Sequence, residues 1–300
     1  MLLITSSLCD VLTPSDELDI PFYENFISQY SEITVSAIVA QLNLDPDSFD
    51  MPKSEFNAQI NELIEGIPSS AMKMRKAFPF MSMGAHIDQG ELVQSNEKRT
   101  FVSDYFTERS QQLGISNQEH VVNALNASAY LSYFGLFEGI LKSLHLQRYP
   151  DDQYKTGNKD TIKKFLKKYI EFRDISDVFE NELRARSKFY NNFKTLEHAW
   201  GLLNFIRNTQ THQNSNYGDK EKTKLNTLYK NLLDVLHDAP DNELLMLLFT
   251  QAFDPIIEQV NEYGFLQFNN TLENFVRNTS VFVMESLYVC ISSKSQKSNQ

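Results

Sequence analysis

The stretch SNQEHVVNALNASAYLSYFGLFEGILKSLHL, residues 116–146, decides the fold class. Ser116 and Glu119 have the spacing of a capping box, in which each residue bonds an amide at the start of a helix. Behind this box, apolar residues recur in steps of three and four: Val122, Leu125, Ala129, Tyr133, Leu136, Ile140 and Leu144. Because this is the period of an amphipathic helix, the stretch predicts a long helix with one buried face.

Similar spacing predicts further helices along the rest of the chain. They cover residues 22–42, 54–65, 96–113, 161–174, 176–211 as one helix or two, 222–237, 241–248 and 270–291, with Pro255 expected to interrupt or kink the chain. Only 10 Gly and 9 Pro occur in 300 residues, which is too few for the many turns of a sandwich or barrel. We therefore predict an all-α chain with a smaller helical N-terminal region at 1–115, a helical bundle at 116–291 and a flexible polar tail at 292–300.

The charge of the chain is unevenly distributed. The net charge is -11, which argues against a general nucleic-acid coat protein. The segment 155–194, however, holds 11 basic and 6 acidic residues and is therefore +5. A local basic region on an acidic body can still hold a polyanion such as RNA.

The cysteines and the apolar runs indicate the cellular compartment in which the chain is expected. Cys9 and Cys290 have no metal-ligand spacing, so neither a disulfide framework nor a metal site is indicated. The first residues lack the basic region of a signal peptide, and no apolar run reaches the length of a membrane helix. We therefore expect a cytoplasmic protein that has no membrane partner, no metal and no cofactor.

One segment carries the residues of a chemical site, Arg207-Asn208-Thr209-Gln210-Thr211-His212. It follows an apolar helical approach and precedes a polar loop. It resembles the signature of the HEPN superfamily, an Arg followed by four to six residues and then a His, often with Asn next to the Arg. Many members of that family have a Tyr soon after the His, whereas here Tyr217 lies five residues further on.

The resemblance implies a HEPN-like bundle with metal-independent endoribonuclease activity, in which Arg207 and His212 are catalytic. It also implies a homodimer whose two motifs face a shared cleft, and RNA products with a 2',3'-cyclic phosphate and a 5'-hydroxyl. The residue types suit this chemistry, because His transfers protons near neutral pH and Arg stabilises charge on phosphoryl oxygens. Proteins of this kind often act as toxins or in antiviral defence, so an inhibitor or antitoxin protein is a further expected partner.

Other residues have two interpretations each. Asn208 can hold a phosphate or the Arg–His geometry, or it can bond its own backbone at a helix end. Glu138 can orient Arg207 or His212, or it can form a simple salt bridge. A basic set can contact RNA or can be a solvated face: Lys163, Lys164, Lys167, Lys168, Arg184 and Arg186.

The spacing of the motif sets a geometric condition. Residues five apart on an ideal helix lie about 140° apart around its axis. Arg207 and His212 can therefore converge only if the helix ends or distorts near residues 209–211, or if a partner chain completes the site. The alternative function is a catalytically silent helical module that binds a partner protein or a nucleotide.

Overall fold

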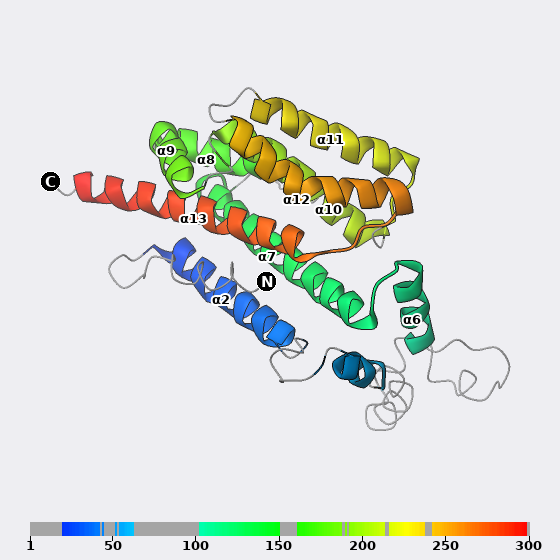
Figure 1. Cartoon of the computed structure of the whole chain (residues 1–300). Coiled ribbons are helices and arrows are strands. Elements are labelled where there is room, and N and C mark those ends of the chain that lie inside the picture. The colour runs from blue at the N-terminus through cyan, green and yellow to red at the C-terminus, as the bar shows by residue number, and fades with distance from the viewer. Residues whose placement is uncertain are drawn as a thin grey trace. The chain divides into compact units, whose positions relative to one another are not determined.

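The computed structural model describes residues 20–42, 44, 52, 54–62, 102–150, 161–187, 190, 192–213, 216–237 and 242–298. These residues are helical almost throughout (Figure 1), and the only β-type pairing among them is a single bridge between Asn216 and Phe265. The prediction of an all-α fold is confirmed.

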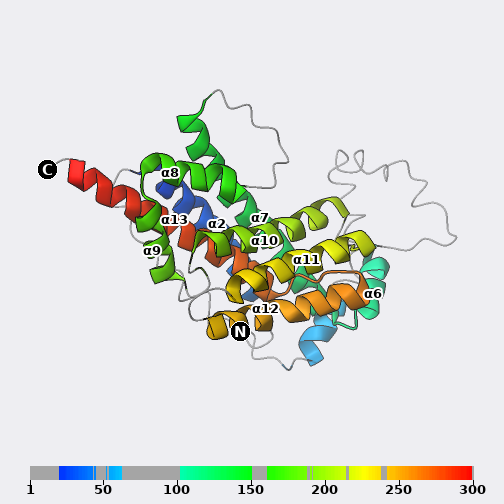
Figure 2. The same ribbon diagram turned by 90° about the horizontal axis from the view of Figure 1, so that it is seen from above.

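The helices that position the site come from the second half of the chain. The described elements are α2 (Pro21–Leu42), residues 54–62, α6 (Val102–Gln112), α7 (Asn117–Arg148), the π-helix η2 (Ile162–Lys167), α8 (Lys168–Arg173), α9 (Ser176–Arg186), α10 (Phe193–Gln213), α11 (Asp219–His237), α12 (Asn242–Tyr263) and α13 (Asn270–Ser298). Helix α11 packs on both α10 and α12, and α13 packs on α9. Figures 1 and 2 both show α10, α11 and α12 side by side.

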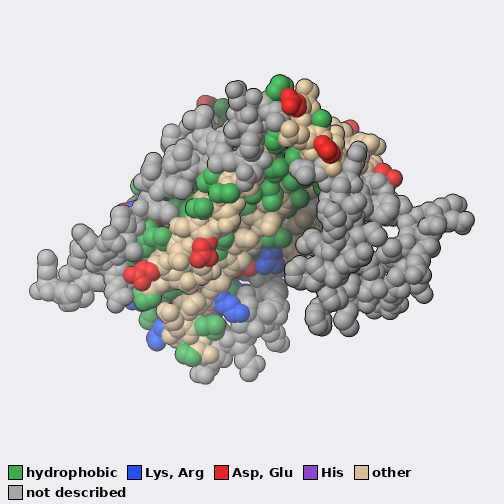
Figure 3. All heavy atoms as spheres, turned by 90° about the horizontal axis from the view of Figure 1, so that it is seen from below, with side chains coloured by type: hydrophobic (Ala, Val, Ile, Leu, Met, Phe, Trp, Pro, Cys, Tyr) green, Lys and Arg blue, Asp and Glu red, His purple; other side chains and the backbone are tan. Residues whose placement is uncertain are grey.

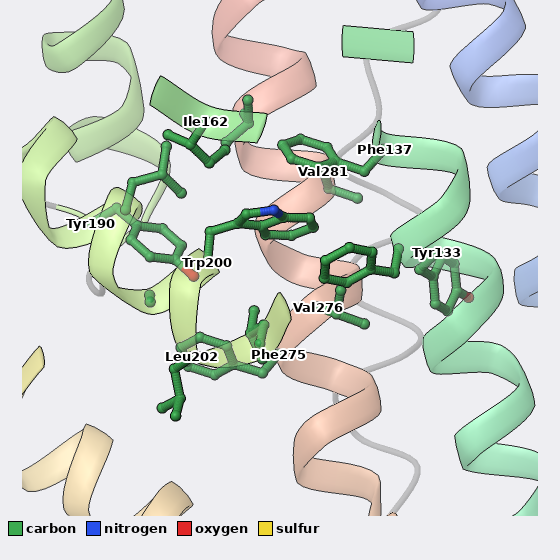
Figure 4. Close-up of a cluster of buried hydrophobic side chains, with 14 of the residues drawn as sticks. Tyr133, Phe137, Ile162, Tyr190, Trp200, Leu202, Phe275, Val276 and Val281 are labelled. Carbon is green, nitrogen blue, oxygen red and sulfur yellow. The ribbon is translucent and has the colours of Figure 1, made fainter. Parts of the chain in front are cut away.

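The core is centred on Trp200 of α10. Its indole stacks on Phe134 of α7, with ring centroids 4.4 Å apart, and lies equally close to Phe137. Figure 4 shows Val276 and Val281 of α13 beside the same ring. All of these side chains are fully buried. The core therefore fixes α10 against α7, and the last turns of α10 carry the Arg-Asn-x3-His motif.

Contacts divide the chain into two units. The described residues up to Ala37 and from Asn126 onward form the larger unit, and those between Ile38 and Leu125 form the smaller one. The division differs from the predicted boundary at 115/116, because the start of α2 packs with the second half. The ring of Tyr23 stacks on Tyr288 of α13 at 4.1 Å, and Thr34 is hydrogen-bonded to Tyr133 of α7 at 2.8 Å.

The structure refines three of the predicted helix boundaries. The stretch 176–211 contains two helices, α9 and α10. The predicted helix end at Leu248 is wrong, because α12 continues through Pro255. The burial of Phe253 and Ile256, on both sides of the proline, stabilises the helix although Pro255 has no amide donor. Helix α13 continues to Ser298, past the predicted end at 291, since no Gly or Pro follows to stop it.

The described surface includes faces with few basic side chains. Figure 3 shows one of them, where hydrophobic and uncharged side chains predominate and Lys and Arg are scattered. None of the described helices has the combination of length and apolar character that a membrane span requires.

Candidate functional site

The motif lies on the last turns of α10, which stays helical to Gln213. Arg207 and Asn208 are half-buried, whereas His212 is exposed. Because the helix does not end between residues 209 and 211, Arg207 and His212 remain about 140° apart around the axis and about 7.5 Å apart along it. The structure therefore excludes a helix end before His212 as the way in which Arg207 and His212 could converge within one chain. Convergence through a partner chain stays open.

Arg207 is held by three contacts on its guanidinium. Its Nη2 donates to Oε2 of Glu138 at 2.9 Å, and its Nη1 donates to Oδ1 of Asn208 at 2.8 Å. Its Cζ lies 4.9 Å from the ring centroid of Phe134, the same ring that stacks on Trp200. The side chain keeps 29% of its surface exposed. The guanidinium is thus fixed in direction while part of it can still reach an anion.

Glu138 joins Arg207 to a third element of the fold. It lies on α7, and its second carboxylate oxygen accepts a hydrogen bond from the hydroxyl of Thr161, just before η2. The Glu138 side chain is 22% exposed. The structure therefore brings Glu138 together with Arg207, one of the two residues that sequence reasoning considered for it. It shows no contact of Glu138 with His212.

Asn208 forms its two hydrogen bonds with side chains. It accepts from Arg207, and its Nδ2 donates to Oδ1 of Asn204 at 3.2 Å. Asn204 lies one turn earlier on α10 and is buried. The chain Asn204–Asn208–Arg207 therefore limits the rotamers of the arginine, and the predicted roles of Asn208 in holding a phosphate or the Arg–His geometry stay predictions.

The hydroxyl of Tyr130 lies close to the ion pair and is buried. It donates to the carbonyl of Leu203 at 2.6 Å. Burial raises the pKa of Tyr130 well above its ordinary value; the charge of Arg207 opposes this rise and that of Glu138 adds to it. Tyr130 therefore stays protonated and serves to fix α7 against α10.

His212 and Tyr217 lie in different environments. His212 is exposed on the last turn of α10, and no hydrogen bond or ion pair joins it to the part of the chain that the structure describes. Tyr217 is buried, its ring lies edge-on to Phe205 at 6.3 Å, and its amide donates to the carbonyl of Gly264 at 2.8 Å. Burial raises the pKa of Tyr217. Tyr217 is thus a packing residue in this chain, while His212 is accessible to solvent.

The basic residues predicted to contact RNA divide into two groups. Exposed positions on η2, α8 and α9 hold Lys163, Lys167, Lys168 and Arg184, and Lys164 is half-buried. Arg186 instead forms ion pairs with Glu182 at 3.5 Å and with Glu285 at 3.4 Å. Carboxylates therefore already balance the charge of Arg186. Residues 155–160, 188–189 and 191 of the basic segment lie outside the described residues.

Two members of the site were missed by sequence reasoning. Thr161 and Phe134 both support the ion pair, Thr161 through Glu138 and Phe134 through the face of its ring. No spacing rule connects them to Arg207, because they come from other elements. Among the described residues, no group of His, Cys, Asp and Glu is arranged to hold a metal ion.

Comparison with protein-family models, with curated proteins and with solved structures finds no match for this chain.

Proposed function

We propose that this chain is an endoribonuclease of the HEPN type that cleaves RNA without a metal ion. The proposal rests on the surroundings of Arg207. Its guanidinium is hydrogen-bonded to Glu138 and Asn208 and is still partly exposed. An exposed His212 follows five residues later on the same helix. An oriented guanidinium is a binding group for phosphate, and an accessible imidazole is a proton-transfer group.

The two side chains divide the reaction between them. His212 takes the proton of the ribose 2'-hydroxyl, whose oxygen then bonds to the adjacent phosphorus. Arg207 stabilises the negative charge that develops on the phosphoryl oxygens. The bond from phosphorus to the 5'-oxygen breaks, that oxygen takes a proton from water, and protonated His212 returns its proton to the solvent, which restores the enzyme. The products are a 2',3'-cyclic phosphate and a 5'-hydroxyl, and Arg207 supplies the cationic charge that a metal ion supplies in other nucleases.

The helical geometry favours a site that is shared by two chains. Within one chain, Arg207 and His212 point about 140° apart from a helix that is intact to Gln213. A two-fold dimer whose α10 ends meet would place Arg207 of one protomer opposite His212 of the other. Such an arrangement is isologous, so each dimer would contain two equivalent sites.

The separation of Arg207 and His212 around α10 also supports the alternative function, a catalytically silent helical module that binds a partner protein or a nucleotide. In that case the Glu138–Arg207 pair would stabilise the packing of α7 on α10, and His212 would be a surface residue. The two functions differ in whether RNA is cut.

The deciding experiment is cleavage of mixed cellular RNA in the presence of EDTA by the native chain, Arg207→Ala and His212→Ala. Cutting by the native chain alone, with cyclic-phosphate ends, supports the nuclease. No cutting by the native chain over a wide range of protein concentration and RNA type contradicts it and favours the binding module. Growth arrest on expression of the native chain but not of His212→Ala would support a toxin or defence role, and an inhibitor protein would then be sought by co-expression.

A further inference from the structure

A second group of side chains with nucleic-acid-binding chemistry lies at the C-terminal end of α7 and on α8. The guanidinium of Arg148 lies over the ring of Phe172 at 4.2 Å and 6.0 Å from the ring centroid of Tyr149. Phe172 is 45% exposed and Tyr149 is 39% exposed. Arg173 is also exposed. Arg148, Tyr149, Phe172 and Arg173 are called the Arg148 patch below.

The Arg148 patch rests on a buried support. His145 is buried and contacts two rings at 4.9 Å, Tyr149 on its own helix and Phe165 of η2. The guanidinium of Arg173 lies 5.5 Å from the ring centroid of Tyr169, which is itself buried. The aromatic rings are therefore positioned by the core, although their outer faces meet solvent. Isolated exposed apolar residues are common, but two exposed rings that share one arginine form a platform.

The charge around the Arg148 patch favours an anionic partner. The segments 142–149 and 161–174 together contain 7 Lys and Arg and 2 Asp and Glu, on a chain whose net charge is -11. No described carboxylate forms an ion pair with Arg148. An acidic chain that concentrates positive charge beside exposed aromatic rings has the two features that single-stranded nucleic acids require.

The Arg148 patch is joined to the Arg207 site by two elements that run in the same direction. Helix α7 passes from Glu138 to His145 and Arg148, and its neighbours along η2 and α8 are Thr161, Phe165 and Phe172 in that order. From Glu138 to Arg148 the rise along α7 is about 15 Å. The exposed Lys163, Lys167 and Lys168 are carried by the segment between the two ends.

We propose that the Arg148 patch is a stacking platform for unpaired RNA bases, and that the RNA strand reaches it from the Arg207 site along η2 and α8. Bases stack on Phe172, on Tyr149 and on the outer plane of Arg148, while Lys168 and Arg173 hold phosphates. Unpaired RNA is required because the bases of a duplex stack on each other and cannot reach a protein ring. The inference rests on the proposed ribonuclease function and names its substrate class.

The test is fluorescence anisotropy with a labelled oligouridine of about twelve nucleotides, in the His212→Ala background so that the probe is not cut. Phe172→Leu and Tyr149→Leu remove the aromatic face and keep an apolar side chain. The matched control is Tyr263→Leu on α12, because Tyr263 is 59% exposed and lies outside the Arg148 patch. Helical circular dichroism and melting confirm that each variant folds.

We expect Phe172→Leu and Tyr149→Leu each to raise the Kd for oligouridine about tenfold, which is within the cost of losing one base–aromatic stack. Tyr263→Leu should leave the Kd unchanged, and an abasic oligomer of equal length should bind weakly to every form. Oligouridine binding that is insensitive to Phe172→Leu and Tyr149→Leu overturns the platform and leaves the ribonuclease proposal standing. Equal binding of the abasic oligomer overturns stacking in favour of charge alone. Absence of binding to any RNA, together with absence of cleavage by the native chain, overturns both proposals.

Discussion

The Glu138–Arg207 pair is the contact on which the site geometry depends, and a double-mutant cycle measures it directly. The variants are Glu138→Gln, Arg207→Gln and the double variant. The pair is a charge-assisted hydrogen bond of 2.9 Å between side chains that are 22% and 29% exposed. Hydrogen bonds to charged groups contribute about 1.5–3 kcal/mol when buried, whereas exposed ion pairs contribute about 0–1 kcal/mol. For this intermediate exposure we expect a coupling of about 1–2 kcal/mol.

The assay is urea unfolding followed by the fluorescence of Trp200, the one tryptophan of the chain. Each single variant should lose stability, and the double variant should lose less than the sum. As a control, Glu138→Gln is combined with Lys230→Gln, an exposed position on α11, for which additivity is expected. If the stability losses of the Glu138 and Arg207 variants added within about 0.5 kcal/mol, Glu138 would not hold the arginine.

Three further predictions concern the dimer, the core and a buried carboxylate. Mixing the inactive Arg207→Ala and His212→Ala chains should restore up to about one quarter of native cleavage after subunit exchange, since each mixed dimer regains one of its two sites; native activity without such restoration would contradict a shared site. Trp200→Ala should cost about 3–5 kcal/mol in urea unfolding followed by circular dichroism, because a fully buried indole is removed, whereas Tyr263→Ala should cost less than about 0.5 kcal/mol. Burial raises the pKa of Glu273, and the nearby Arg277 opposes the rise, so the Glu273 carboxyl contributes stability at low pH that is lost as the pH rises through its raised pKa. The melting temperature of Glu273→Gln should lack this pH-dependent contribution. An identical pH dependence of melting in the native and variant chains would contradict the prediction.

The elements that the sequence predicts best are those with strong local signals. The capping box forms as expected, because the Ser116 amide donates to Glu119 at 2.8 Å and the Glu119 amide donates to the Ser116 hydroxyl at 3.1 Å. The apolar stripe of α7 from Ala129 to Leu144 is buried. Both signals depend on residues within one or two turns of each other, and such local rules can be evaluated without knowing the fold.

The elements that the sequence misses depend on long-range packing. Pro255 looks like a break, but its helix is held by the burial of Phe253 and Ile256. Thr161 and Phe134 support Arg207 only because η2 and α7 pack beside α10. Propensity and spacing rules contain no information about such contacts between elements.

In the candidate site, too, local signals are predictable from the sequence and long-range geometry is not. Residue types and spacing indicate Arg207 and His212 as candidates for phosphate binding and proton transfer. They do not indicate that α10 remains helical to Gln213, which separates the two side chains within one chain. The homodimer that the family resemblance implies therefore stays a prediction, and the intact helix is the observation that favours it.

In the proposed reaction the ribose 2'-hydroxyl is the nucleophile, and Arg207 and His212 act on it without a metal ion. The most direct measurement compares two oligonucleotides of the same sequence in EDTA, one all-ribose and one with 2'-deoxyribose at the mapped cleavage position. We expect the native chain to cut the first to a 2',3'-cyclic phosphate and to leave the second intact at that position. Cutting of the deoxy-substituted position at a comparable rate would contradict it.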